Sequence, residues 1–109
     1  MHELSIAMGI VEAACESAGG AKISRVVVEV GALTAVLPDA LLFCFDAAAA
    51  GTDAEGAALE IRATQGVADC GACGARTSVD RFTTSCPCGS FDLVWSSGRE
   101  LRVIELEVD

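Results

Sequence analysis

The amino terminus of this 109-residue chain carries its only histidine, His2, between Met1 and Glu3. If Met1 keeps a free amine, that amine, the backbone nitrogen of His2 and its ring Nδ1 can close two fused chelate rings on one metal ion. Such nitrogen donors suit Ni(II) or Cu(II), which favour square-planar or tetragonal ligation. In most proteins, however, a histidine here would simply be exposed to solvent, because chain termini are usually disordered. A metal role for His2 therefore needs a second indication of metal chemistry.

Four of the six cysteines supply that indication. They form two pairs, Cys70-Gly-Ala-Cys73 and Cys86-Pro-Cys88, each followed by glycine and separated by a twelve-residue loop. This spacing is typical of a four-thiolate metal site, and we predict a structural zinc ion, with the iron of a rubredoxin-like knuckle as the alternative. The second pair is one residue shorter than C-x-x-C. We therefore expect an altered pattern of amide hydrogen bonds to its sulfur atoms and a more labile metal.

The composition excludes several classes of partner. Sixteen acidic residues against seven basic ones give a net charge of -9, whereas a nucleic-acid surface needs clustered lysine and arginine. No basic region precedes the first apolar stretch, and the longest apolar run, residues 40–45, is too short to cross a bilayer. We expect a soluble, cytoplasmic protein without nucleic-acid or membrane partners. In that compartment, paired cysteines bind metals rather than form disulfides.

Two stretches are predicted to form helices, the first from its amphipathic apolar spacing and the second from the residues at its two ends. The first covers residues 4–18 and ends at a glycine pair, and the second covers residues 38–50 and begins with proline, a favoured first helical residue. Met8 and Cys15 fall on the apolar side of the first helix, and Cys44 lies inside the second. We interpret all three as core residues rather than ligands.

Three further stretches have the composition and alternation of β-strands, namely residues 22–30, 58–63 and 100–108. The predicted fold class is α+β, a two-layer α/β sandwich of two helices on a small mixed sheet with an inserted zinc-ribbon-like subdomain. We place the sandwich domain at residues 1–65 plus 97–109 and the zinc-binding insert at residues 66–96. The expected sandwich core includes Leu4, Val11, Val26, Val28, Phe45, Leu59 and Ile61.

The insert needs its metal in order to fold. Its large apolar residues are few, among them Val67, Val79, Phe82, Phe91, Leu93 and Trp95. Their burial cannot offset the entropy lost when some thirty residues are ordered. A four-thiolate zinc site supplies on the order of 10 kcal/mol of apparent binding energy, which becomes folding energy.

Several motifs together resemble the HypA/HybF family, the nickel chaperones of NiFe-hydrogenase maturation. The resemblance covers essentially the whole chain. It is carried by the Met1-His2-Glu3 start, Leu42-Phe43-Cys44-Phe45-Asp46, Ala54-Glu55-Gly56, the two cysteine pairs and the closing segment from Ser97-Gly98 to Ile104-Glu105.

The resemblance implies a function and a set of partners. His2 would be the required nickel ligand, with the Met1 amine and Glu3 supporting or completing the site, and the four paired cysteines would hold a structural zinc that communicates with nickel loading. The partners would be a HypB-type GTPase and the hydrogenase large-subunit precursor, with a homodimer as one possible form. The chain agrees in having no phosphate-binding P-loop of its own.

Two other classes of function compete with this interpretation. An enzyme would need a base or nucleophile pair, and one histidine, no tyrosine and cysteines committed elsewhere offer little for one, so we expect no catalytic activity. A zinc-ribbon adaptor that binds only proteins would leave His2 without a role. Metal analysis separates the cases, because an adaptor holds zinc alone and a chaperone also takes one weakly held nickel ion.

Overall fold

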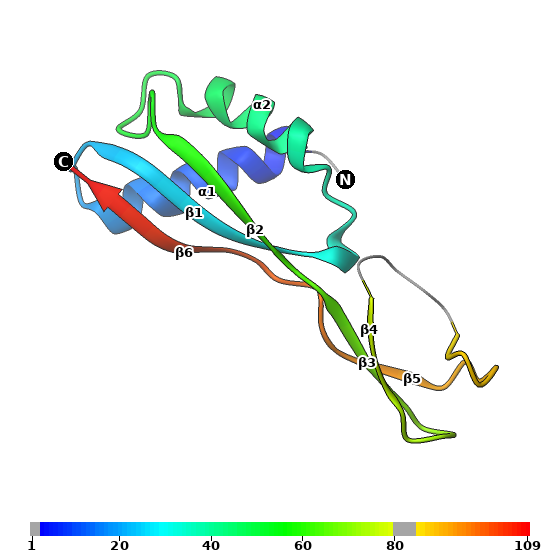
Figure 1. The fold of residues 1–109 in the computed structure, drawn as a ribbon. Coiled ribbons are helices and arrows are strands. Elements are labelled where there is room, and N and C mark those ends of the chain that lie inside the picture. Colours follow the sequence, from blue (N-terminus) through cyan, green and yellow to red (C-terminus); the bar gives the residue numbers. More distant parts are fainter. Residues whose placement is uncertain (1–2, 80–84) are drawn as a thin grey trace. The chain divides into compact units, whose positions relative to one another are not determined.

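The computed structural model describes residues 3–79 and 85–109, shown in Figure 1. The chain divides into two compact units. The first, here called the helix–sheet unit, comprises Met1–Glu29, Val36–Arg62 and Arg102–Asp109. The second, the cysteine unit, comprises Val30–Ala35 and Ala63–Leu101.

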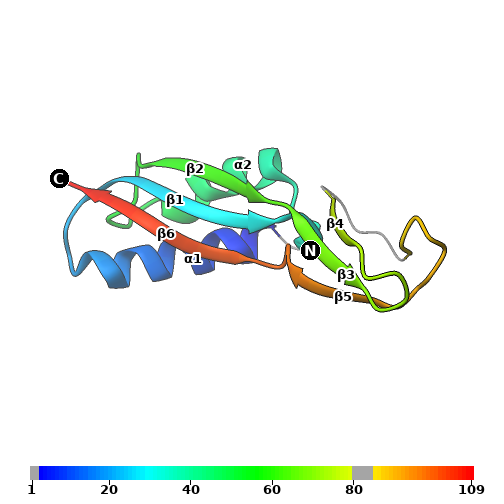
Figure 2. The same ribbon diagram turned by 60° about the horizontal axis from the view of Figure 1, so that its bottom comes forward.

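The helix–sheet unit is built from two helices and most of a three-stranded sheet. The helices are α1 (Glu3–Ala18) and α2 (Pro38–Ala49), and the strands are β1 (Ile23–Gly31), β2 (Ala58–Thr64) and β6 (Leu101–Val108). The sheet has the order β2-β1-β6, and Figure 1 shows β2 running in the direction of β1 and β6 running against it. Both helices lie on one face of the sheet and contact each other (Figures 1 and 2). The predicted α+β class with a small mixed sheet is confirmed.

The buried side of α1 differs from the predicted one. Its buried residues are Ala7, Ile10, Val11 and Ala14. Leu4 is exposed and Met8 is 57% exposed, so the prediction that these two residues lie in the core was wrong. Apolar residues cover a wide arc of this helix, and the side that packs is the one where small alanines allow a close approach. Cys15 and Cys44 are only half-buried, so their interpretation as core residues holds in part.

Strand β1 is the centre of the unit and is buried on both faces. Val26, Val27 and Val28 have no exposed surface, although alternation places Val27 opposite its two neighbours. Arg25 and Glu29 share the face of Val27 and form ion pairs with neighbouring strands. The partners of Arg25 are Glu60, Glu105 and Glu107, and that of Glu29 is Arg102. The helices therefore cover the face of Val26 and Val28, and polar side chains shield Val27.

The remaining predicted core residues are buried to different degrees. Val11 and Phe45 are buried, as expected, together with Leu41 of α2. Leu59 and Ile61 on strand β2 are half-buried, which agrees with the position of β2 at an edge of the sheet. Among the described residues, no helix has the length and apolarity needed to cross a membrane.

The cysteine unit contains the second sheet, and this one is antiparallel. Its strands are β3 (Gly66–Cys70), β4 (Arg76–Val79) and β5 (Leu93–Ser97), in the order β4-β3-β5. The unit also takes in the end of β1 and the short 3-10 helix η1 (Ala32–Thr34). Hydrogen bonds explain this, since the Gly31 amide donates to the Glu100 carbonyl and the Leu33 amide to the Gly98 carbonyl, both at 2.7 Å. The predicted division into two independently folding domains stays a prediction.

Three glycines meet at the base of the cysteine unit. A Cβ on Gly31 would lie 2.1 Å from the carbonyl oxygen of Gly98, and a Cβ on Gly98 would lie 2.6 Å from the Cα of Gly66. Gly98 also has a φ of +112°, a conformation that residues with side chains rarely adopt. Backbones at this point touch directly, so no larger residue fits at Gly31 or Gly98.

Candidate metal centres

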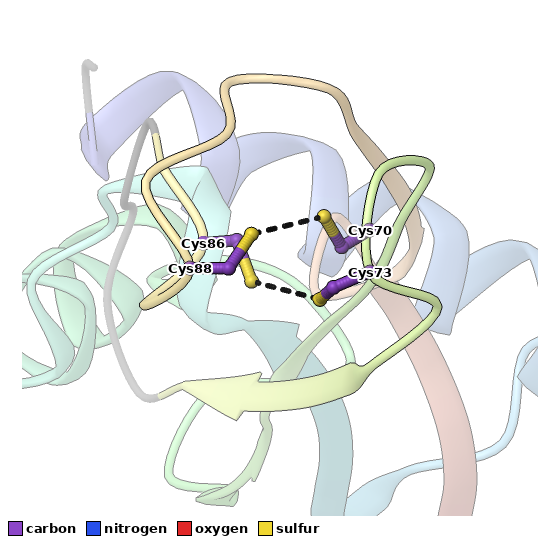
Figure 3. A group of neighbouring side chains, drawn as sticks. All are labelled: Cys70, Cys73, Cys86 and Cys88. Atoms are coloured by element: carbon purple, nitrogen blue, oxygen red, sulfur yellow. Dashed lines mark hydrogen bonds between the residues drawn. The ribbon is translucent and has the colours of Figure 1, made fainter.

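The fold brings together the four cysteines that the sequence pairs. Their sulfur atoms all lie within 4.8 Å of one another. Two contacts join sulfur atoms of opposite pairs, at 3.7 Å between Cys70 and Cys88 and 3.6 Å between Cys73 and Cys86. Figure 3 shows two loops that face each other and turn their sulfur atoms inward. Cys70 and Cys86 are buried, whereas Cys73 and Cys88 are exposed at the rim.

The first pair forms a tight loop after strand β3. The Cys70 amide donates to the Ala75 carbonyl, and the Gly74 amide donates back to the Cys70 carbonyl, both at 2.9 Å. Inside this loop, the amides of Cys73 and Ala72 donate hydrogen bonds to the Cys70 sulfur. These two donors favour the thiolate and lower the pKa of Cys70 to about 6.

The second pair has a similar loop with fewer donors to sulfur. The Cys86 amide donates to the Ser90 carbonyl, and the Gly89 amide donates to the Cys86 carbonyl, both at 2.8 Å. The backbone donor to the Cys86 sulfur is the Cys88 amide. This bond favours the thiolate, but burial and the neighbouring thiols outweigh it and raise the pKa of Cys86 to about 12. The amide donors to the Cys86 sulfur thus differ from those to the Cys70 sulfur.

The electrostatics of the cluster call for a cation. Burial and the neighbouring thiols oppose ionisation of Cys86, and four thiolates this close together would repel one another without a cation between them. A tetrahedral Zn(II) with Zn–S bonds of about 2.3 Å would place its sulfur ligands about 3.8 Å apart. The observed contacts of 3.6 and 3.7 Å fit that geometry. A four-thiolate donor set also suits iron, so the cluster fits the two metals that the sequence predicts.

Contacts between the two loops support the cluster. The Gly71 amide donates to the Asp92 carbonyl at 2.8 Å, and a Cβ on Gly71 would lie 2.0 Å from Asp92 Oδ2. The Asp92 amide in turn donates to Ser90 Oγ at 3.0 Å. Sequence reasoning did not identify Gly71 or Asp92, and the only signal was a glycine directly after the first cysteine.

Of the predicted nickel-binding residues, the structure describes Glu3. Met1 and His2 lie outside the described residues. Glu3 is the first residue of α1, and its Oε2 accepts a hydrogen bond from the Leu37 amide at 3.3 Å. Leu37 directly precedes α2, so this contact joins the starts of the two helices. Nothing in the sequence predicted it.

Comparisons with known proteins place the chain in a family. The family model for HypA, the metallochaperone of hydrogenase/urease nickel incorporation, matches residues 1–108. The hydrogenase maturation factor HypA of a Nostoc species is 45% identical over 109 residues, covering all of this chain and 96% of the relative. That of Geobacter sulfurreducens is 46% identical over 110 residues, covering all of both chains.

A solved structure agrees with this assignment. The solution structure of the Ni metallochaperone HypA from Helicobacter pylori superposes with a TM-score of 0.69 at 25% identity, covering 99% of this chain and 97% of that one. The resemblance inferred from the sequence motifs is therefore confirmed. The chain belongs to the HypA family of hydrogenase maturation factors and nickel-incorporation metallochaperones.

Proposed function

We propose that this chain binds Ni(II) at its amino terminus and delivers it to the hydrogenase large-subunit precursor. The ligands are His2, the Met1 amine and the backbone nitrogen between them, with Glu3 supporting the site. The observation that carries the proposal is the family match over residues 1–108, which includes a start containing the chain's only imidazole. The proposed partner for nickel transfer is a HypB-type GTPase, and we expect the protein to act in the cytoplasm without catalytic activity.

The proposal assigns a separate, structural role to the cysteine cluster. Cys70, Cys73, Cys86 and Cys88 hold Zn(II), with iron as the alternative that metal analysis excludes or establishes. Sulfur separations close to those of a tetrahedral thiolate site support this assignment. Zinc has no redox chemistry, which suits a site that stabilises a loop rather than transfers electrons.

Nickel titration of the untagged protein tests the first part. The protein as isolated should contain one zinc ion per chain and take up one nickel ion. His2→Ala should lose the nickel ion and keep the zinc and the fold, whereas Cys15→Ser, which removes a half-buried thiol on α1, should keep both metals. A His2→Ala protein that bound one nickel ion with unchanged affinity would overturn the assignment, because the chain has no second imidazole.

Hydrogenase activity in cells tests delivery. A strain with His2→Ala should fail to mature its hydrogenase at low nickel and should recover part of the activity when nickel is added in excess. The His2→Ala variant should capture the large-subunit precursor as well as the wild-type chain does. Normal maturation at low nickel in the variant strain would favour the adaptor, which binds proteins and leaves His2 without a role.

A further inference from the structure

The N-cap residue of α2, Leu37, has no side-chain cap of its own. In a capping box, the amide of the N-cap residue donates to a glutamate or glutamine at the third helical position. Here Pro38 is the first helical residue, so the third position is Ala40, whose methyl group cannot accept a hydrogen bond. Instead, the Leu37 amide donates to the side chain of Glu3 in α1, which is 34 residues away in the sequence.

The same carboxylate also lies in the first turn of its own helix. A negative charge there interacts favourably with the positive end of the α1 dipole. Glu3 therefore interacts with the starts of both helices. Its charge stabilises the first turn of α1, and its Oε2 accepts a hydrogen bond from the Leu37 amide before α2. Met1 and His2, the residues of the proposed nickel site, come directly before this anchored residue.

We propose that Glu3 is a positioning residue for nickel, which anchors the first turn of α1 to the Leu37 amide, and that its carboxylate is not a nickel ligand. The inference rests on the proposed nickel site at Met1 and His2. A chelate built from consecutive residues loses backbone entropy when it closes on the ion. Anchoring the next residue removes part of that loss before nickel arrives, which raises affinity without adding a ligand.

The two roles need different chemistry from residue 3. A ligand role depends on the negative charge and strong donor character of a carboxylate oxygen. An anchor depends on an acceptor oxygen at the right distance from the Leu37 amide, which the side-chain carbonyl of glutamine also offers. Glu3→Gln therefore separates the roles, and Glu3→Ala removes both.

A second variant removes the donor and leaves Glu3 intact. Proline at position 37 has no amide hydrogen, and the φ of Leu37, -87°, is close to the value that proline requires. The Leu37 side chain is 64% exposed, so little packing is lost. Leu37→Ala is the matched control, because it removes the side chain and keeps the amide.

The experiment is a nickel titration of the full zinc-loaded protein and these variants. Glu3→Gln and Leu37→Ala should bind within about twofold of the wild type, as should Glu16→Gln, a control for lost charge on the exposed side of α1. Glu3→Ala and Leu37→Pro should each bind about fivefold more weakly, the effect of one exposed hydrogen bond. The double variant should be no weaker than either single one, because both remove the same bond.

Amide exchange at Leu37 in the nickel-free protein gives an independent readout. Exchange should be faster in Glu3→Ala and unchanged in Glu3→Gln. Equal nickel loss in Glu3→Gln and Glu3→Ala, with normal binding by Leu37→Pro, would overturn the proposal and make the carboxylate a ligand. If the proposed nickel site itself is wrong, His2→Ala will bind nickel normally, while the exchange at Leu37 still reports whether the anchor exists.

Discussion

The two units of this protein are stabilised by different means. In the helix–sheet unit, both helices and the central strand contribute buried apolar residues, among them Ile10, Val11, Ile23, Leu41 and Phe45. In the described part of the cysteine unit, the buried apolar residues other than cysteine are Val30 and Ala68. Phe91, one of its few large apolar residues, is 78% exposed. The helix–sheet unit is stabilised by an apolar core, whereas the cysteine unit has few buried apolar residues and a cluster of four thiols.

This difference determines what each unit depends on. Burial of a large apolar side chain contributes about 1.5–3 kcal/mol, so the helix–sheet unit sums many moderate contributions. A structural zinc ion contributes on the order of 10 kcal/mol at a single point. A chelator and a core mutation should therefore act on different parts of the same chain.

Loss of the metal should have the largest effect. Cys73→Ser, or a strong chelator, should unfold the cysteine unit, because Cys73 is exposed and its replacement removes a ligand rather than packing. Amide exchange should show protection lost in β3 and β5 and retained in α1 and β1, while Cys15→Ser leaves both units protected. Protection lost along the whole chain would show that the two units form one cooperative core.

A core truncation should produce the converse result. Phe45→Ala should destabilise the helix–sheet unit by about 3–5 kcal/mol, because Phe45 is fully buried. The neighbouring Phe43 is 80% exposed, so Phe43→Ala is a matched control that should cost less than about 0.5 kcal/mol. Denaturant unfolding measures both, and zinc content should stay at one ion per chain. Similar costs for the two variants would contradict the described packing of α2.

The two cysteine pairs also differ from each other. The Cys70 sulfur has amide donors from Ala72 and Cys73, whereas the Cys86 sulfur has its donor from Cys88 alone among the described residues. One residue inserted between Cys86 and Cys88 restores the longer spacing, and zinc transfer to a chromophoric chelator should slow about fivefold. Pro87→Ala keeps the short spacing and should leave the rate unchanged. Faster zinc transfer from the insertion variant would show that the native short spacing retains zinc better than the longer one.

The smallest effect should come from acid acting on the ion pairs beside β1. A hydrogen bond from Arg25, and then one from Arg62, holds the pKa of Glu60 below its ordinary value of 4.5. The lowered pKa stabilises the folded state above that ordinary value, and the contribution is lost as pH falls through the folded pKa. Thermal unfolding of the helix–sheet unit should therefore occur at a slightly lower temperature below about pH 4.5. Glu60→Gln and Arg25→Gln should both flatten this pH dependence, and an unchanged profile in either would contradict the described pairing.

The sequence predicted features that depend on local pattern. The first helix, expected at residues 4–18, is found at Glu3–Ala18, because a glycine pair ends its apolar spacing. The spacing of the cysteines indicated that four thiols would meet, and the shortened second pair indicated a different amide pattern. Each of these signals lies within a short stretch of chain.

The features that the sequence missed depend on packing between distant segments. Met8 and Ile10 are both apolar, and only the fit of α1 against its neighbours decides that Ile10 is buried and Met8 exposed. The contact between Glu3 and Leu37 joins residues 34 positions apart, with no local motif to announce it. The amino-terminal assignment at His2 stays a prediction, supported by the family match.

The glycines at the base of the cysteine unit bear on how such a protein can be assembled. Gly66 and Gly98 lie backbone against backbone, so the segment between them leaves and returns at the same point. When the two ends of a segment touch, evolution can insert, delete or replace that segment without moving the strands that flank it, here β2 and β6. Deletion of residues 66–98 should therefore leave little distance to bridge. A short turn that joins residues 65 and 99 should suffice to close the chain.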